Sequence, residues 1–148
     1  MYKRQSEIRY KLDEKGRVIK ETWYNVSTLE VVTQYIYKYD EKGHRSETEL
    51  YWSDKGLELQ EVTLFKTDKY GRIVEESHYD PENKLIIRMT NEYNSKGLRI
   101  SSTLYDGTKT EKIEYIYEFD EKGNWISEKV IFEGIARCLT TREFEYYK

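Results

Sequence analysis

Apolar and polar side chains alternate along most of the chain, in short stretches rich in Tyr, Ile, Val, Thr and Phe. An alternation with a period of two is typical of β-strands, and no stretch has the 3.6-residue spacing of an amphipathic helix. We therefore predict an all-β protein with ten or eleven strands. They are expected at residues 2–12, 17–25, 29–39, 44–52, 57–67, 72–79, 84–93, 98–105, 109–119, 124–132 and 136–147.

A short motif recurs five times and ends every second predicted strand. Its clearest copies read Tyr-Lys-Tyr-Asp-Glu-Lys-Gly at 37–43 and Tyr-Glu-Phe-Asp-Glu-Lys-Gly at 117–123. Asp or Asn, two ordinary residues and then Gly is what a type I turn followed by a left-handed residue requires. The five glycines are Gly16, Gly43, Gly71, Gly97 and Gly123, and second reversals are expected at 26–29, 53–56, 80–83, 106–107 and around Gly134. The pattern predicts five hairpin repeats in one antiparallel meander.

The predicted sheet has two half-polar faces. If the flanks of each glycine turn pair directly, one face carries Tyr35, Tyr37, Tyr39, Phe65, Tyr115, Tyr117, Phe119 and Trp125, with Tyr24, Tyr51, Tyr79 and Tyr105 from the outgoing strands. The opposite face then carries Trp23, Ile36, Leu50, Leu64, Leu104, Ile116 and Val130, mixed with Glu21, Glu76, Glu114 and Glu128. A sandwich needs one uniformly apolar face. We expect one domain over 1–148, built as a strongly curled or open single sheet, with closure into a barrel as the alternative.

The repeated strings resemble the YD repeats of the bacterial RHS family. The resemblance rests on residues 37–44 and 117–125 and on the Asp-x-x-Gly-Arg strings at 13–17 and 68–72, and it extends over nearly the whole chain. The short Tyr- and Gly-containing hairpins of MORN-like repeats are a weaker parallel. The likeness to RHS proteins implies a bacterial interaction module without enzymatic activity.

Charge and composition exclude several classes of partner. Charged residues make up 36% of the chain, but both signs are interspersed and the formal net charge is only −3, so no nucleic-acid footprint is expected. No run approaches the roughly 20 apolar residues of a membrane-spanning helix. We expect a cell-envelope or secreted protein if a leader has been removed and a cytoplasmic one otherwise, and a monomer or homodimer. Charges near the two ends are expected to protect the open sheet edges, namely Lys3, Arg4, Glu7, Arg9, Arg142, Glu143, Glu145 and Lys148.

The sequence offers no catalytic or metal-binding constellation. Its two histidines, His44 and His78, lie at different offsets in their repeats, and the single Cys138 is paired with neither of them at a ligand-like spacing. Acidic residues are so frequent that no single carboxylate pair indicates acid–base chemistry. We therefore predict no cofactor, no metal and no enzymatic activity.

The rings are the candidate binding residues. They form two clusters and one separate position: Tyr35, Tyr37 and Tyr39; Tyr115, Tyr117, Phe119 and Trp125; and Trp52 before a turn. Tyr and Trp provide large, rigid contact areas with a polar tip, which favours a binding or scaffold module for a protein or glycan. The competing interpretation is that the rings stabilise a thin sheet through cross-strand pairs. A barrel-shaped small-molecule carrier and a cytosolic immunity-type inhibitor are the alternative functions.

Overall fold

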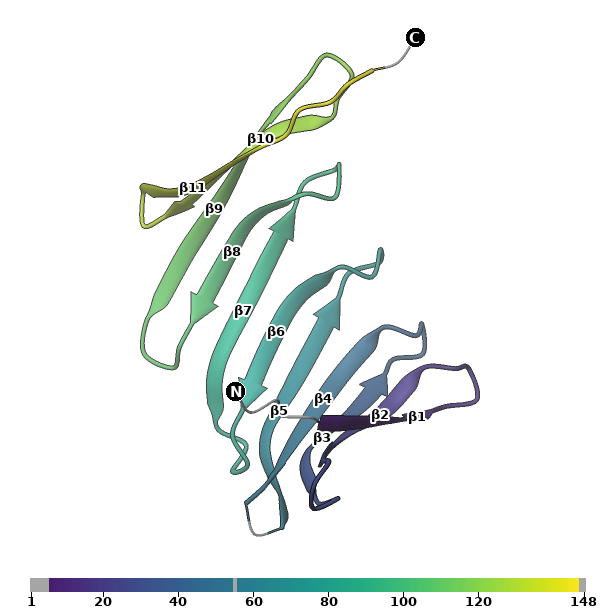
Figure 1. The fold of residues 1–148 in the computed structure, drawn as a ribbon. Helices are drawn as coiled ribbons and strands as arrows, with labels where there is room; N and C mark the ends of the chain where they lie inside the picture. The colour runs from purple at the N-terminus through teal and green to yellow at the C-terminus, as the bar shows by residue number, and fades with distance from the viewer. Residues whose placement is uncertain (1–5, 55, 147–148) are drawn as a thin grey trace. The chain divides into compact units, whose positions relative to one another are not determined.

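A computed structural model of the protein describes residues 6–54 and 56–146, and every regular element within them is a β-strand. The chain forms eleven antiparallel strands that follow one another in the order β1 to β11 (Figure 1). They are β1 (Ser6–Leu12), β2 (Val18–Asn25), β3 (Val31–Tyr39), β4 (Arg45–Ser53), β5 (Leu57–Thr67), β6 (Ile73–Tyr79), β7 (Leu85–Tyr93), β8 (Arg99–Tyr105), β9 (Thr110–Phe119), β10 (Trp125–Phe132) and β11 (Ile135–Thr141). The predicted all-β meander is confirmed.

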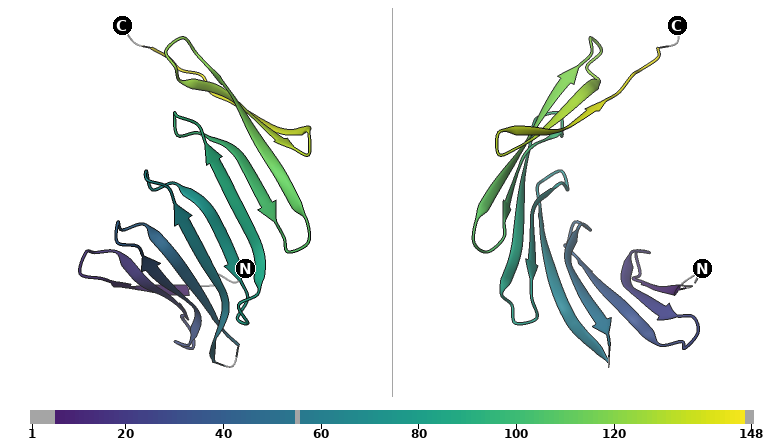
Figure 2. Two further views of the ribbon diagram at one scale, coloured as in Figure 1. Left: turned by 180° about the vertical axis from the view of Figure 1, so that it is seen from behind. Right: turned by 60° about the vertical axis from the view of Figure 1, so that its left-hand side comes forward.

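The chain divides into two compact units, which are described separately. The first unit ends at Ile87 and holds β1 to β6 with the start of β7, whereas the second begins at Arg88 and holds the rest of β7 with β8 to β11. In each unit the strands lie side by side in one layer, and the glycine turns all connect the strands at the same end (Figure 2).

The strand ends agree with the prediction except at the last strand. β11 ends at Thr141, and residues 142–146, which were expected to continue it, are in no strand. The start of the first predicted strand, residues 2–5, lies outside the described residues. The barrel alternative was wrong, because within the described strands β1 pairs with β2 alone and β11 with β10 alone. A barrel interior must be filled by side chains or hold a ligand, so the small-molecule carrier that required closure loses its structural basis.

The glycine turns have the predicted geometry. At the first of them the N–H of Gly16 donates to the carbonyl oxygen of Asp13 (3.0 Å), and Gly16 has a left-handed φ of 76°. The Asp13 carboxylate accepts hydrogen bonds from the backbone N–H groups of Arg17 and Lys15, both at 2.9 Å. These bonds, with that from the Arg17 backbone the strongest, lower the pKa of Asp13. The Asp or Asn at the start of each motif is thus explained by the turn itself.

A β-bulge after each glycine turn changes the predicted assignment of faces. Tyr39 pairs with Arg45, but Lys38 pairs with Glu47, so the outgoing strand contains one extra residue at this point. Successive side chains in a strand alternate between faces, and one extra residue inverts the alternation beyond it. The turn-flanking pairs were predicted correctly, including Phe119 opposite Trp125. The predicted faces of the outgoing strands were wrong.

The inverted alternation places specific side chains on the face opposite to the predicted one. Tyr51 pairs with Gln34 and so faces away from Tyr35. By the same register Tyr24, Tyr79 and Tyr105 also lie on the face opposite the predicted rings. The residues that take their places beside the rings are Glu21, Trp23, Leu50 and Glu76 in the first unit and Leu104, Glu128 and Val130 in the second.

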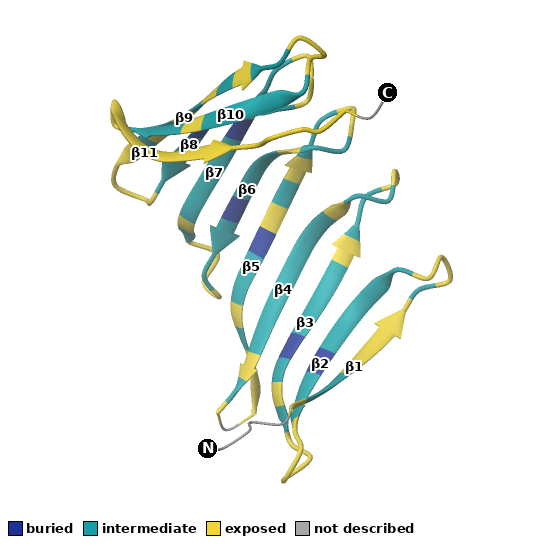
Figure 3. Ribbon diagram, turned by 45° about the horizontal axis from the view of Figure 1, so that its top comes forward, coloured by how far each residue is buried: buried dark blue, intermediate teal, exposed yellow. Residues whose placement is uncertain are grey.

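The described residues contain no buried hydrophobic side chain. The side chains that are buried are all polar: Thr22, Gln34, Thr63, Ser77, Asn91, Ser101 and Ser102. They lie within the strands, away from the turns (Figure 3). Each unit is therefore a single sheet, stabilised by the backbone ladder and by contacts between side chains on the same face.

Candidate binding site

The first predicted ring cluster forms a stack along β3. Tyr35 and Tyr37 are parallel to within 5°, with ring centroids 6.2 Å apart. The guanidinium of Arg45 lies 4.1 Å from the centroid of Tyr37, and that of Arg17 lies 4.4 Å from the centroid of Tyr39. All three rings are half-buried. Cations and a neighbouring ring thus lie against these rings, an arrangement that would also stabilise the sheet.

Two hydroxyl groups of this cluster, those of Tyr37 and Tyr39, form hydrogen bonds. Tyr37 donates to the carboxylate of Glu21 (3.1 Å), which also accepts a hydrogen bond from the indole N–H of Trp23 (2.5 Å). Tyr39 donates to the carbonyl oxygen of Val18 (2.7 Å). Burial, together with the hydrogen bond to Glu21, raises the pKa of Tyr37 to about 12. The polar tips of these rings therefore bind neighbouring strands of the same sheet.

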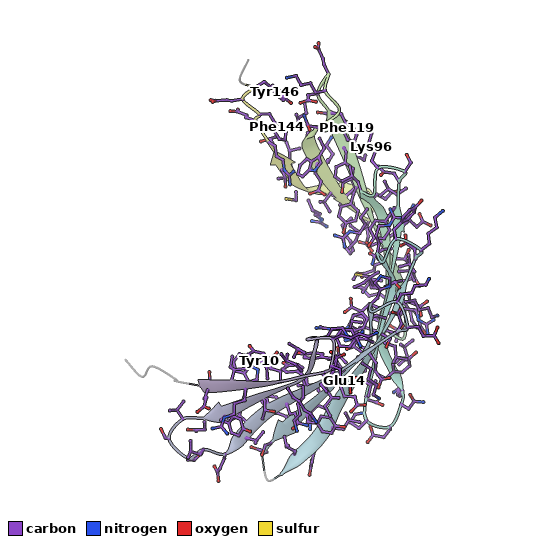
Figure 4. All side chains as sticks on the ribbon, turned by 90° about the vertical axis from the view of Figure 1, so that its right-hand side faces the viewer. Tyr10, Glu14, Lys96, Phe119, Phe144 and Tyr146 are labelled. Atoms are coloured by element: carbon purple, nitrogen blue, oxygen red, sulfur yellow. The ribbon has the colours of Figure 1, made fainter. Side chains whose placement is uncertain are left out.

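The second cluster repeats this arrangement in the second unit. Tyr115, Phe119 and Trp125 each have a cation over the ring, and Lys96 can be seen beside Phe119 in Figure 4. The three cations are Arg99 at 4.5 Å, Lys96 at 3.6 Å and Arg142 at 3.3 Å from the respective centroids. Seven of the eight predicted binding residues thus belong to ring–cation or ring–ring contacts, in agreement with the stabilising interpretation.

The last ring of this cluster, Tyr117, is held by hydrogen bonds and an edge contact. Its hydroxyl donates to the carboxylate of Glu128 (2.8 Å) and lies 3.0 Å from the carbonyl oxygen of Arg99. The ring meets Trp125 edge-on, with centroids 6.0 Å apart. Burial and the hydrogen bond to Glu128 raise the pKa of Tyr117 to about 12, as for Tyr37.

These two tyrosines make the stability of the protein sensitive to alkaline pH. Unfolded tyrosines lose their protons near pH 10, whereas Tyr37 and Tyr117 keep theirs to about pH 12. The folded state therefore binds more protons in this window, and the free energy of unfolding should fall as the pH rises from about 10 to about 12. Denaturation at pH 9 and pH 11 measures the difference. The double variant Tyr37→Phe, Tyr117→Phe should show a smaller difference in the free energy of unfolding between the two pH values. Leu50→Val, the control, should lower stability equally at both. An unchanged difference in the double variant would contradict the raised pKa values of the two tyrosines.

The eighth predicted residue, Trp52, differs from the others. Its side chain is 60% exposed, and no ring, cation or hydrogen bond to it is found within residues 6–54 and 56–146. It borders a hollow of about 380 Å³ at the turn between β4 and β5, which the described residues Asp54, Glu58 and Gln60 also line. This volume lies at the small end of the range of ligand pockets, about 300–1,000 Å³.

Trp52 also belongs to a row of side chains across three strands. Thr33 on β3 pairs with Trp23 on β2 and with Trp52 on β4, so two indoles lie on one face with a small residue between them. Two strand spacings separate them, about 9.6 Å. The sequence analysis placed Trp23 on the opposite face because it omitted the bulge after Gly16. The extra residue is Ile19, beyond the correctly predicted pair Leu12–Val18, and the turn motif itself does not signal it.

Among the described residues, no cation forms an ion pair with the two carboxylates of the hollow beside Trp52. Asp54 and Glu58 are both exposed, and neither forms an ion pair with any residue in the described part of the chain. Glu58 is the cross-strand partner of Trp52. The carboxylates of the strands elsewhere are often paired, as Glu47 and Glu49 are with Lys38, both at 2.7 Å. Exposed indole and free carboxylates together define the candidate site.

Residues 142–146 extend the repeat pattern beyond β11. The rings of Phe144 and Tyr146 lie 24° from parallel with centroids 6.3 Å apart, similar to the Tyr35–Tyr37 stack (Figure 4). The amide of Asn124 donates to the hydroxyl of Tyr146 (2.7 Å). This segment therefore packs on the last glycine turn as the start of a sixth hairpin unit would.

Metal-ligating and membrane-spanning features were also sought. Within the described ranges no three His, Cys, Asp or Glu side chains gather in a way that could hold a metal ion. His78 instead hydrogen-bonds to the carboxylates of Glu61 (2.8 Å) and Glu76 (2.9 Å). The same part of the chain holds no helix of the length and apolar character that crossing a membrane requires.

The fold defines a class of protein, an all-β meander of hairpin units, and no hydrophobic side chain is buried among residues 6–54 and 56–146. No family model matches the chain, and neither does any curated protein. A solved structure of a protein of unknown function from Bacteroides fragilis has a TM-score of 0.51 at 12% identity, covering 94% of this chain and 93% of that one. A DUF3836 family protein from Bacteroides vulgatus has a TM-score of 0.42 at 16% identity over 72% of this chain and 96% of that one. The first similarity shows a shared fold alone.

Proposed function

We propose that the protein is a non-enzymatic binding module that recognises a protein partner through Trp52 and the hollow beside it. The observation that supports this function is the exposure of Trp52 in a chain whose other predicted rings are covered. An exposed tryptophan beside a hollow is typical of interface hot spots, where one such residue contributes a large share of the binding free energy. The sheet below it is a rigid support, because the hydrogen-bonded strands β3 and β5 flank β4.

Selection from a displayed peptide library tests this proposal. We expect the wild-type protein to enrich a family of peptide sequences that Trp52→Ala binds at least tenfold more weakly, since truncating a hot-spot residue costs about 2 kcal/mol or more. The thermal stability of the Trp52→Ala variant should be nearly unchanged, because the side chain is exposed. Binding is measured by titration of the enriched peptides.

Tyr70→Ala is the matched control. The Tyr70 ring is 70% exposed but lies in a glycine turn, outside the hollow, so its loss should leave peptide binding intact. Equal binding of the enriched peptides to the wild type and Trp52→Ala would overturn the proposal. Binding of a glycan that depends on Trp52, found on a glycan array in the absence of peptide binding, would overturn it in favour of a glycan partner.

A further inference from the structure

We infer that the hollow beside Trp52 binds a cationic side chain, arginine or lysine, of the partner. This inference rests on the proposed function and assigns the chemistry of the group that is recognised. It is argued from three features of the hollow: the free face of an indole, the two unpaired carboxylates and the position of both at one end of a hairpin.

The indole supplies the first part of the recognition. Tryptophan attracts a cation over its ring more strongly than the other aromatic side chains. Trp125 already has this arrangement within the protein, with the guanidinium of Arg142 3.3 Å from the ring centroid. The same contact recurs at Tyr37, Tyr39 and Tyr115. Among the exposed rings, Tyr70 has Lys69 and Arg72 nearby, whereas no cation lies over Trp52 in the described residues. Trp52 thus has a ring face open to a cation from another molecule.

The carboxylates supply the second part. Asp54 and Glu58 line the same hollow as Trp52, and Gln60 adds an amide that can bond to a donor. Without an ion-pair partner, two exposed carboxylates attract a cation and disfavour an anionic or acidic ligand. Glu58 faces Trp52 directly across the strand pair, so one guanidinium or ammonium group can lie over the indole while it donates to this carboxylate.

The position of the hollow fits a side chain better than a free ion. The hollow lies at the end of the β4–β5 hairpin, open to solvent, and its walls come from two strands and their turn. A metal ion would need three or more ligands converging on one point, and no such group exists within the described ranges. A long cationic side chain with its apolar stem along the indole needs only the ring and one or two acceptors.

Paired peptides that differ in charge alone test the inference. The probes are a blocked peptide with one arginine between glycines and the same peptide with citrulline, which has nearly the shape of arginine without its charge. Binding is followed through the indole N–H signals in ¹H–¹⁵N spectra, assigned with Trp52→Phe. We expect the arginine peptide to shift the Trp52 signal with about tenfold or greater preference over the citrulline peptide. The Trp125 signal, from an indole in the second unit whose ring is already covered by Arg142, serves as the internal reference.

Charge-neutral variants complete the test. Asp54→Asn with Glu58→Gln should remove most of the preference for arginine, whereas Glu82→Gln, an exposed acid in another turn, should retain it. Equal affinity for arginine and citrulline peptides would overturn the inference, and so would a preference that survives in the Asp54→Asn, Glu58→Gln variant. The library selection separates the two proposals: if selected peptides require Trp52 but show no dependence on charge, the binding function stands and the cation inference fails.

Discussion

Gly71→Ala should lower the free energy of unfolding by roughly 2–3 kcal/mol, because two separate costs add at this turn. Gly71 has a φ of 80°, a left-handed conformation that costs a residue with a Cβ about 1–2 kcal/mol. A Cβ at this position would also lie 2.7 Å from Nε2 of His44, the residue that follows the glycine of the preceding turn. Urea denaturation measures the loss.

Two further variants separate the backbone strain of the left-handed φ from the steric contact with His44. Gly16 has a similar φ of 76° with nothing within 4 Å of an added Cβ, so Gly16→Ala should show the conformational cost alone. In a His44→Ala background the effect of Gly71→Ala should fall toward that of Gly16→Ala. If Gly71→Ala and Gly16→Ala cost the same, the His44 ring moves away from the added Cβ and the contact carries no cost.

Asn91→Ala should destabilise the second unit by about 2–3 kcal/mol, because it leaves a buried hydroxyl without its partner. Ser102 is only 1% exposed, and its hydroxyl donates to the side-chain oxygen of Asn91 at 2.7 Å. An unsatisfied buried polar group costs far more than the net value of the hydrogen bond it lost. The variant tests whether buried polar pairs replace the hydrophobic core in this fold.

A double-mutant cycle isolates that pair. Ser102→Ala together with Asn91→Ala should cost less than the sum of the two single changes, by about 1 kcal/mol or more, because neither group is then left unpaired. Chemical denaturation of the four proteins gives the coupling free energy. Strict additivity would show that the two side chains contribute independently.

The sequence predicted the fold well because its signals are local. Alternation within strands and the Asp-x-x-Gly turn each depend on neighbouring residues, and the five turns lie where the glycines predicted them. The faces of the outgoing strands were predicted wrongly because one extra residue inverts the alternation of all later side chains between the two faces. In β4 this residue is Ser46, which lies between the pairs Tyr39–Arg45 and Lys38–Glu47. The end of β11 at Thr141 could not be predicted from alternation, which continues in the sequence to 146.

The candidate site was predicted in part. Trp52 was singled out for its place before a turn, and the structure gives it an exposed ring and a hollow. Residue type alone could not show that the other predicted rings have partners and Trp52 does not. The cations over those rings, such as Arg17 over Tyr39, come from other strands or turns. Trp23 was missed through the inverted face, and the two unpaired carboxylates could be recognised only once the ion pairs elsewhere were known.

The absence of buried hydrophobic side chains among the described residues has a consequence for how such a chain can evolve. In a protein with a central core, every added segment must find space against all the others, whereas within each unit the described strands contact mainly the strands beside them. Inserting or deleting one unit of some 27 residues therefore leaves the remaining contacts intact, apart from the new junction. A change in the number of hairpins therefore lengthens or shortens the exposed surface in steps of one hairpin.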